Sequence, residues 1–238
     1  MKKLSLLFTK DGLQWHISKG KTVLEGAFHF VTEETSPHLV EEKLDEVLKF
    51  DDYKEIEVIS ALNHFSLTPD SFTEHELGYK LISYNAPVDE ANEELMLSVN
   101  KKFAVQFYYT FPKHFYQKIK AKKLPTKFNF SGEKFLNALT VKNHKEIHIN
   151  LYHHQVEFFA FENKKVVLYN NLDADSEVDF LYFIMFSLSK INFGTAETHF
   201  HIYGETHENE TFISELRKFV KNIKVHFDNA PKKNFVLS

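Results

Sequence analysis

The segment Ser176–Lys190, SEVDFLYFIMFSLSK, constrains the fold most, because its apolar residues leave almost no polar side over three turns. This pattern predicts a helix that is packed on several sides. Its large apolar side chains are Val178, Phe180, Leu181, Tyr182, Phe183, Ile184, Met185, Phe186 and Leu188. Each contributes about 1.5 to 3 kcal/mol when buried, before conformational entropy is subtracted. We therefore expect this helix to form the centre of a hydrophobic core.

The length and charge of the chain limit its class. Its 238 residues suit one large domain or two halves that share an interface. The net charge is -4 and Arg217 is the only arginine, so the chain lacks the basic surplus that binds nucleic acid. Cysteine is absent, which excludes disulfides and thiolate chemistry and suits a reducing compartment.

The apolar runs are too short for a secretion signal or a membrane span. The run Leu4–Phe8 is followed at once by Thr9-Lys10-Asp11-Gly12, which predicts a strand and a turn instead of a signal peptide. The helix at Ser176–Lys190 is shorter than the roughly 20 residues that cross a bilayer. We expect a soluble, cytoplasmic protein without membrane insertion.

The hydrophobic pattern predicts the same order of elements twice. The first part has strands at Leu4–Phe8, Leu13–Ser18 and Thr22–Phe30, a helix from Ser36 to about Phe50, and a strand at Ile56–Ala61. It continues with a helix after Pro69, strands at Leu95–Val99 and Phe103–Tyr109, a helix at Pro112–Lys123, a strand at Lys127–Phe130 and a helix at Gly132–Val141. The second part has strands at Glu146–Tyr152, Val156–Phe161 and Lys165–Tyr169, the long apolar helix, a strand at His199–Tyr203, a helix at Asn209–Asn222 and a strand at Lys224–Phe227.

This repeated order indicates a duplication. Superposing the second turns of the two parts places Trp15 on Phe159, which are 144 positions apart (159 − 15 = 144). The predicted halves are residues 1–142, with an inserted or extended segment around 85–130, and residues 143–238. They would join near Val141–Lys145.

Four short motifs carry a resemblance to a known family. They are FSLTPDSF at Phe65–Phe72, DFLYFIMFSL at Asp179–Leu188, THFHIYGE at Thr198–Glu205 and ELRKFVKNI at Glu215–Ile223. With the repeated order, they resemble an uncharacterised bacterial family, a domain of unknown function whose fold is a degenerate actin-like (RNase H-like) ATPase. The resemblance implies an α/β fold of two similar halves, each with helices and a mixed sheet in which a three-stranded antiparallel meander continues into parallel strands. It implies no established activity.

The residues that would bind a nucleotide are only partly present. Nucleotide-binding actin-like proteins place an acid-x-Gly-Thr or acid-x-Gly-Ser loop between their first two strands, where amides and a hydroxyl reach the phosphates. Asp11 and Gly12 are candidates for a vestigial loop of this kind, although Asp-Gly is also the commonest hairpin turn. The matching segment of the second half, His153-His154-Gln155, has neither acid nor glycine. Gly204 is a candidate for the adenosine loop or a plain turn residue, and we predict no cofactor and no catalytic residue.

The 14 histidines raise the question of a metal site. His148 shares a strand face with Asn150, His201 shares one with Tyr203, and the two strands would be neighbours. In this interpretation no carboxylate accompanies the histidines, and histidines often line a polar sheet face, so we predict no metal. Glu146 lies at the edge of its strand, without the partner carboxylates that a two-metal nuclease needs.

Other clusters have plainer explanations. The acids of Asp173–Asp179 lie where a helix begins, which the helix dipole favours, and they lack the glycine and glutamate of a calcium loop. The lysines of Lys118–Lys123 predict a solvated helix face. Some aromatic residues of Phe107–Tyr116 are candidates for a surface that faces a partner. No serine lies in a nucleophile elbow.

These observations favour a non-catalytic actin-like protein that works through contact with a protein partner. The alternative is a nucleotide-binding protein or weak ATPase that uses the cleft between the halves, lined by Asp11, Gly12 and Gly204. A third hypothesis is small-molecule or peptide binding in that cleft without phosphate recognition.

Overall fold

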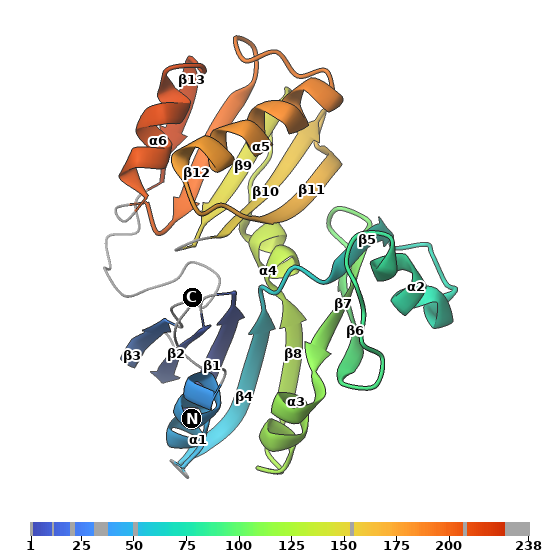
Figure 1. Ribbon diagram of the computed structural model, residues 1–238, viewed down its shortest axis with the longest axis vertical. Coiled ribbons are helices and arrows are strands. Elements are labelled where there is room, and N and C mark those ends of the chain that lie inside the picture. Colours follow the sequence, from blue (N-terminus) through green and yellow to red (C-terminus); the bar gives the residue numbers. More distant parts are fainter. Residues whose placement is uncertain are drawn as a thin grey trace. The chain divides into compact units, whose positions relative to one another are not determined.

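The chain divides into two compact units, residues 1–137 and residues 138–236. The computed structural model describes residues 2–10, 12–19, 22–30, 38–49, 52–152, 155–206 and 209–226. Each unit contains a five-stranded mixed sheet with helices on it (Figure 1). The sequence places the junction between residues 142 and 143, a few positions after the division between the units.

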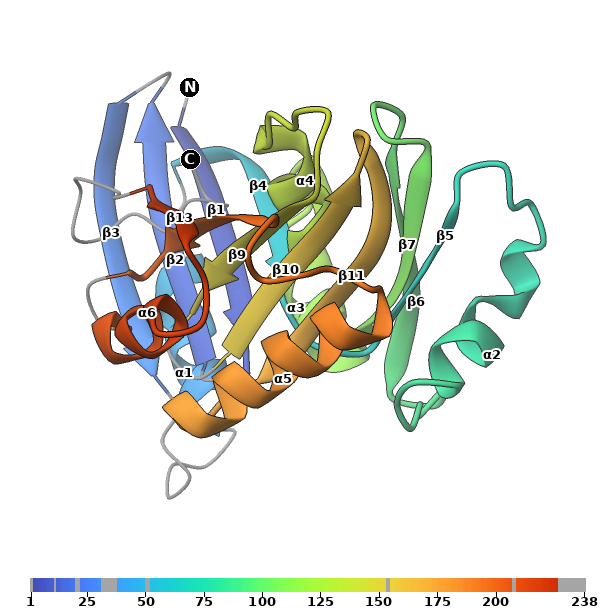
Figure 2. The same ribbon diagram turned by 90° about the horizontal axis from the view of Figure 1, so that it is seen from above.

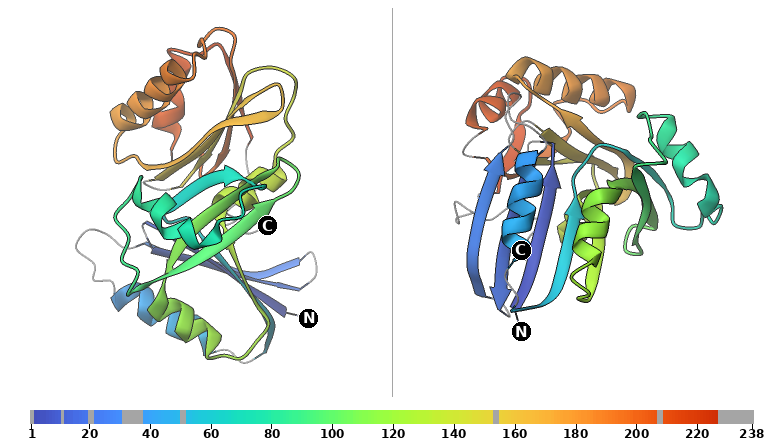
Figure 3. Two further views of the ribbon diagram at one scale, coloured as in Figure 1. Left: turned by 90° about the vertical axis from the view of Figure 1, so that its right-hand side faces the viewer. Right: turned by 60° about the horizontal axis from the view of Figure 1, so that its bottom comes forward.

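The first unit is built on a sheet in the order β3-β2-β1-β4-β8. Its strands are β1 (Lys2–Thr9), β2 (Gly12–Lys19), β3 (Thr22–Phe30), β4 (Tyr53–Ser60) and β8 (Thr126–Phe130). The first three strands form the predicted antiparallel meander, and β4 runs parallel to both β1 and β8. Helices α1 (His38–Leu48) and α3 (Lys113–Lys120) lie over one face of this sheet (Figure 3, right). Their Leu44 and Ile119 join Leu6 and Val58 of the strands in one hydrophobic core.

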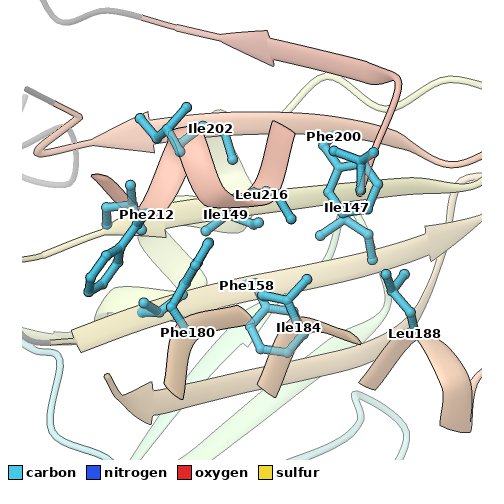
Figure 4. Close-up of a cluster of buried hydrophobic side chains, with 14 of the residues drawn as sticks. Ile147, Ile149, Phe158, Phe180, Ile184, Leu188, Phe200, Ile202, Phe212 and Leu216 are labelled. Atoms are coloured by element: carbon cyan, nitrogen blue, oxygen red, sulfur yellow. The ribbon is translucent and has the colours of Figure 1, made fainter. Parts of the chain in front are cut away.

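The second unit repeats this arrangement with the order β11-β10-β9-β12-β13. Its strands are β9 (Glu146–Leu151), β10 (Gln155–Glu162), β11 (Lys165–Asp173), β12 (His199–Gly204) and β13 (Asn222–Val225). Helices α5 (Glu177–Lys190) and α6 (Glu210–Arg217) lie on the same side of the sheet (Figure 2). Figure 4 shows their core, in which Phe180 and Ile184 of α5 meet Phe158 and Ile149 of the strands.

The two sheets correspond residue by residue, down to one irregularity. A β-bulge lies between Ile17 and Ser18 where β2 pairs with β3, and another lies between Ala160 and Phe161 where β10 pairs with β11. Equivalent residues of these strands are therefore 143 positions apart (160 − 17 = 143). The predicted offset of 144 is wrong by one residue, and in a strand such a slip exchanges the two faces.

Helix α5 lies where the sequence predicts it, but it is less buried than expected. Ser176 caps its N-terminus, accepting a hydrogen bond from the Asp179 amide. Phe180, Ile184 and Leu188 face the sheet and are buried. The prediction of packing on several sides is wrong, because the helix is an outer layer and only its inner side is covered. Val178, Tyr182 and Phe186 are 75%, 59% and 48% exposed.

The first unit has extra elements between β4 and α3. They are β5 (Phe65–Pro69), the 3-10 helix η1 (His75–Leu77), α2 (Gly78–Ser83), β6 (Glu93–Asn100) and β7 (Val105–Pro112). The strands form a separate antiparallel sheet in the order β5-β7-β6. The sequence expects the insertion around 85–130, whereas these elements run from Phe65 to Pro112. Helix α4 (Ser131–Ala138) follows β8.

The structure narrows two predictions for this region. The predicted helix after Pro69 is shorter, because η1 and α2 together span only His75–Ser83, and the strand β5 before it was not predicted. A Cβ at Gly78 would lie 2.6 Å from Leu95 Cδ2, so the first residue of α2 packs closely on β6. Of the aromatic candidates for a partner-facing surface, Phe107, Tyr108, Tyr109 and Phe111 in β7 are buried, whereas Phe115 and Tyr116 in α3 are half-buried.

None of the helices described by the structure is both long enough and apolar enough to cross a membrane.

Candidate functional site

The positions of the two phosphate loops are tight hairpins. In the first unit, Thr9 pairs with Gly12, so only two residues join β1 to β2. Asp11 lies outside the described residues. In the second unit, the Tyr152 amide donates a hydrogen bond of 2.9 Å to the Gln155 carbonyl, and the two residues between them are also outside the described part. Each hairpin thus closes over a loop of two residues.

Gly204 has a structural explanation. It ends β12 with φ +81°, and a Cβ there would lie 2.3 Å from the Leu151 carbonyl oxygen and 2.4 Å from Asn150 Oδ1. Only glycine lets the end of β12 approach β9 this closely. Gly204 belongs to the second unit, whereas Gly12 belongs to the first.

The histidines of β9 and β12 meet as the sequence predicts. His148 lies directly opposite His201 in the parallel pairing of these strands. Their rings stack with centroids 4.6 Å apart and planes 11° from parallel. They lie on the face of the sheet opposite to α5 and α6, because their neighbours Ile149 and Ile202 point into the core.

A carboxylate accompanies these histidines, and the prediction that none does is wrong. Glu146 Oε2 lies 3.1 Å from His148 Nε2, and Glu146 Oε1 lies 3.7 Å from His201 Nε2. His144 Nε2 is 2.9 Å from Glu146 Oε1. The sequence contains the signal, because Glu146 and His148 are two residues apart in one strand and must share a face. The interpretation of Glu146 as an edge residue missed it.

Further contacts orient these three side chains. His148 Nδ1 is 3.1 Å from the Tyr203 hydroxyl, and His201 Nδ1 is 3.0 Å from His226 Nε2. The Lys142 amide donates a hydrogen bond of 3.1 Å to Glu146 Oε2. Both rings and the carboxylate are therefore held by groups outside the cluster.

The protonation states follow from burial and from the neighbouring groups. Burial lowers the pKa of His148, although Glu146 opposes the shift. Burial and the nearby His148 lower the pKa of His201 to about 4. Burial alone would raise the pKa of Glu146, but the hydrogen bonds from His148 and the Lys142 amide lower it overall. At neutral pH the cluster thus consists of one carboxylate and two neutral imidazoles.

In the part of the chain that the structure describes, one group of three or more acidic or histidine side chains has the spacing of metal ligands. It consists of Glu146, His148 and His201, whose ligand atoms all lie within 4.8 Å of one another. Glu146 and His148 are fully buried, and the His201 side chain is 18% exposed. The cluster thus offers an oxygen and two nitrogens at one point, reachable from solvent beside His201.

The other charged clusters serve the fold. Lys118 binds Glu41 and Asp45 of α1, at 2.7 and 2.9 Å, which ties α3 to α1. Asp179 in the first turn of α5 accepts a hydrogen bond from the Ser176 hydroxyl. The Asp179 contact agrees with the predicted helix-start acids, whereas Lys118 is half-buried against α1 and α3 ends at Lys120, so the lysines form no continuous solvated helix face.

A second candidate site is a groove of about 570 Å³ beside the exposed face of α5. It is lined by Glu177, Val178, Leu181, Tyr182, Met185 and Glu215, of which the last belongs to α6. Tyr182 stacks on Phe186 with ring centroids 5.8 Å apart, and Lys190 Nζ lies 5.0 Å from the centre of the Phe186 ring. Apolar side chains therefore form its floor, and two glutamates lie at its border.

Comparison with solved structures gives the fold. A Bacteroides thetaiotaomicron protein with an actin-like ATPase fold and unknown function superposes with a TM-score of 0.83 at 20% identity, covering 99% of this chain and 93% of that one. The chain therefore has the actin-like ATPase fold, and the predicted fold class is confirmed.

Two secretion and pilus proteins are more distant. The PilM-PilN type IV pilus biogenesis complex gives a TM-score of 0.61 at 9% identity, covering 94% of this chain and 88% of that one. The cytoplasmic domain of EpsL, an inner membrane component of the type II secretion system of Vibrio cholerae, gives 0.53 at 8%, covering 98% and 87%. No curated protein sequence matches. The model of a family described as protein of unknown function (DUF3822) matches residues 1–223.

Proposed function

We propose that this chain, which belongs to the DUF3822 family of proteins of unknown function, is a non-catalytic actin-like protein that binds a protein partner. The observation that carries this proposal is the outer face of α5. Val178, Tyr182 and Phe186 recur every four residues, so they form one exposed apolar stripe. Contiguous apolar surface of this kind marks interaction sites.

The strand ends support the absence of nucleotide chemistry. A phosphate cradle needs several successive amides that point at the ligand. In the first unit, the pairing of Thr9 with Gly12 leaves only two residues in the loop. In the second unit, Gly204 already packs against the end of β9. The first feature favours a loop that closes a hairpin, and the second favours a glycine that lets two strands approach, over loops that hold phosphates.

The groove beside α5 favours a particular kind of partner. Apolar residues form its floor, and Glu177 and Glu215 add negative charge at its border. Glu215 Oε1 forms an ion pair with Lys218 Nζ at 2.5 Å, so Glu177 is expected to attract a cationic partner more strongly than Glu215 does. The occupant that fits is an amphipathic helix of another protein, with apolar residues along one side and lysine or arginine beside them. A similar fold occurs in the PilM-PilN type IV pilus biogenesis complex, which agrees with a partner-binding role.

A designed peptide tests this surface. A fluorescent amphipathic helix with flanking lysines should bind the full chain, and the double variant Tyr182→Ala, Phe186→Ala should bind at least tenfold more weakly by anisotropy. Tyr84→Ala is the matched control, because Tyr84 is 72% exposed in the first unit and should leave the affinity unchanged. The docking surface is wrong if the peptide does not bind at millimolar concentration or binds the double variant equally well. If a peptide with glutamates in place of the lysines binds equally well, the proposal that the partner helix is basic is wrong.

Thermal-shift titration with ATP, ADP and GTP, each with magnesium, tests the nucleotide-binding alternative. A ligand at about 100 times its dissociation constant stabilises a fold by about 2.7 kcal/mol. We expect no rise in melting temperature at millimolar nucleotide. A rise that Asp11→Ala removes would overturn the non-catalytic function and favour the weak ATPase.

A further inference from the structure

We propose that Glu146, His148 and His201 form a binding site for a divalent transition-metal ion such as zinc. Such a site lies beyond the partner-binding function above and uses the opposite face of the second sheet. The three side chains come from two adjacent parallel strands, because β9 supplies Glu146 and His148 and β12 supplies His201. A bound ion would therefore join the two central strands of the second unit.

The donor set suits such an ion. Two imidazoles and one carboxylate are an established ligand set for zinc, with the remaining position open to water or substrate. The ligand atoms lie within 4.8 Å of one another. Zinc binds nitrogen and oxygen at about 2.0 to 2.2 Å, so an ion between them reaches all three after small side-chain rotations.

The surroundings of the cluster resemble those of metal sites. A histidine that binds metal usually contacts a further polar group through its other ring nitrogen, which fixes the ring. Here His148 Nδ1 meets the Tyr203 hydroxyl, and His201 Nδ1 meets His226 Nε2. Both Nε2 atoms are thereby directed toward Glu146.

A second observation concerns Glu146 itself. Its Oε1 is buried, and although His144 Nε2 lies 2.9 Å away, that contact does not have the geometry of a hydrogen bond. A buried polar atom of this kind costs stability unless a ligand or ion satisfies it. A cation placed between Oε1 and the rings of His148 and His201 would bind this oxygen directly.

Zinc binding to the full chain is the direct test. After removal of metal with a chelator, calorimetry with Zn²⁺ should show one equivalent bound, and Co²⁺ should give the visible absorption of a low-symmetry site. Glu146→Gln and His201→Gln should each weaken binding about 100-fold or more. His114→Gln is the matched control, since His114 is exposed on α3, and it should keep wild-type affinity.

Tyr203→Phe provides a second test if Glu146→Gln and His201→Gln do not fold. It retains the ring and removes only the hydroxyl that contacts His148, so zinc affinity should fall about tenfold while the metal-free melting temperature changes little. The site is refuted if no equivalent of Zn²⁺ binds to the wild-type chain. It is also refuted if Tyr203→Phe and His201→Gln bind zinc as tightly as His114→Gln.

Discussion

The two sheets place different chemistry at equivalent positions. Lys3 in β1 corresponds to Glu146 in β9, and Glu57 in β4 corresponds to His201 in β12, because β1 pairs with β4 in the same register in which β9 pairs with β12. In the first unit, Glu57 lies between Lys3 and Lys134 and forms ion pairs with both. In the second unit, Glu146 lies among imidazoles.

This difference separates two effects: the fold determines where the polar residues lie, and the side chains determine which kind of site they form. In each unit the sheet brings two of these polar residues together, but the third has a different origin, because Lys134 comes from α4 whereas His148 lies in β9 at the position of Ser5. Two lysines neutralise the carboxylate of the first unit with fixed charges, which leaves no room for a cation. His148 donates a hydrogen bond to the carboxylate of the second unit, but the neutral imidazoles bring no positive charge, so the carboxylate keeps its charge as a ligand. The same architecture thus supports a closed ion-pair network in one unit and a candidate metal site in the other.

Among equivalent positions of the two sheets, we expect the largest difference in stability at the ends of β12 and β4. Gly204 corresponds to Ser60, since Phe8 pairs with Ser60 as Leu151 pairs with Gly204. Gly204→Ala should lower the free energy of unfolding by about 3 kcal/mol, because it adds a Cβ in a left-handed conformation against backbone atoms. Ser60→Ala should cost less than about 1 kcal/mol, because its hydroxyl accepts one long hydrogen bond of 3.4 Å. Urea denaturation measures both, and equal losses would contradict the special role of Gly204.

The ion-pair network of the first unit should respond to pH. Burial alone would raise the pKa of Glu57, but Lys3 and Lys134 lower it overall. Its folded pKa is thus below the unfolded value of about 4.3, so its contribution is present above that pH and is lost as pH falls through the folded pKa. Glu57→Gln should cost about 2 kcal/mol at pH 7 and less at pH 3.

Chemical denaturation at both pH values measures the loss for Glu57→Gln. Glu55→Gln, an exposed neighbour in the same strand, is the control and should have little effect at either pH. A cost for Glu57→Gln that grows toward pH 3 would show that the carboxylate is not held by the lysines.

A smaller effect is expected at a carboxylate of the second unit. Glu157 is fully buried and accepts hydrogen bonds from the hydroxyls of Tyr169, at 2.7 Å, and Tyr152, at 3.0 Å. Tyr169→Phe should cost about 1 kcal/mol, because it removes one hydrogen bond to Oε1 while Tyr152 still donates to Oε2. Tyr182→Phe, on the exposed face of α5, should cost almost nothing. Equal melting temperatures for the two variants would argue against a role for the buried hydrogen bond.

The order of elements in the two repeated sheets could be predicted from the sequence, because alternation and helical periodicity depend on local spacing, whereas β5 of the inserted sheet was missed. The register could not, because the superposition of Trp15 on Phe159 depended on turns whose pairing only the structure shows. The exposed face of α5 was missed for a different reason. Apolar periodicity indicates which residues avoid water on average, whereas the number of layers over a helix is a property of the tertiary fold.

The candidate sites also combine features that local spacing predicts with features that only the tertiary structure shows. Strand alternation correctly predicted that His148 and His201 meet across adjacent strands. The same rule places Glu146 beside them, but its position at the start of a strand concealed this. The roles of Asp11 and Gly12 stay predictions, since Asp11 lies outside the described residues. For Gly204, the contacts that explain the glycine come from β9, more than fifty positions away in the chain.

The matched bulges also indicate the order of events in the evolution of the two halves. An inserted residue displaces every later pairing in its strand, so moving it requires several compensating changes at once. A lysine, by contrast, becomes a glutamate by one substitution. The simplest history is that an ancestral half already carried the bulge before the chain was doubled, and that the polar residues of the two copies diverged afterwards. The bulge between Ile17 and Ser18 is therefore a better landmark for aligning the halves of related chains than any of their side chains.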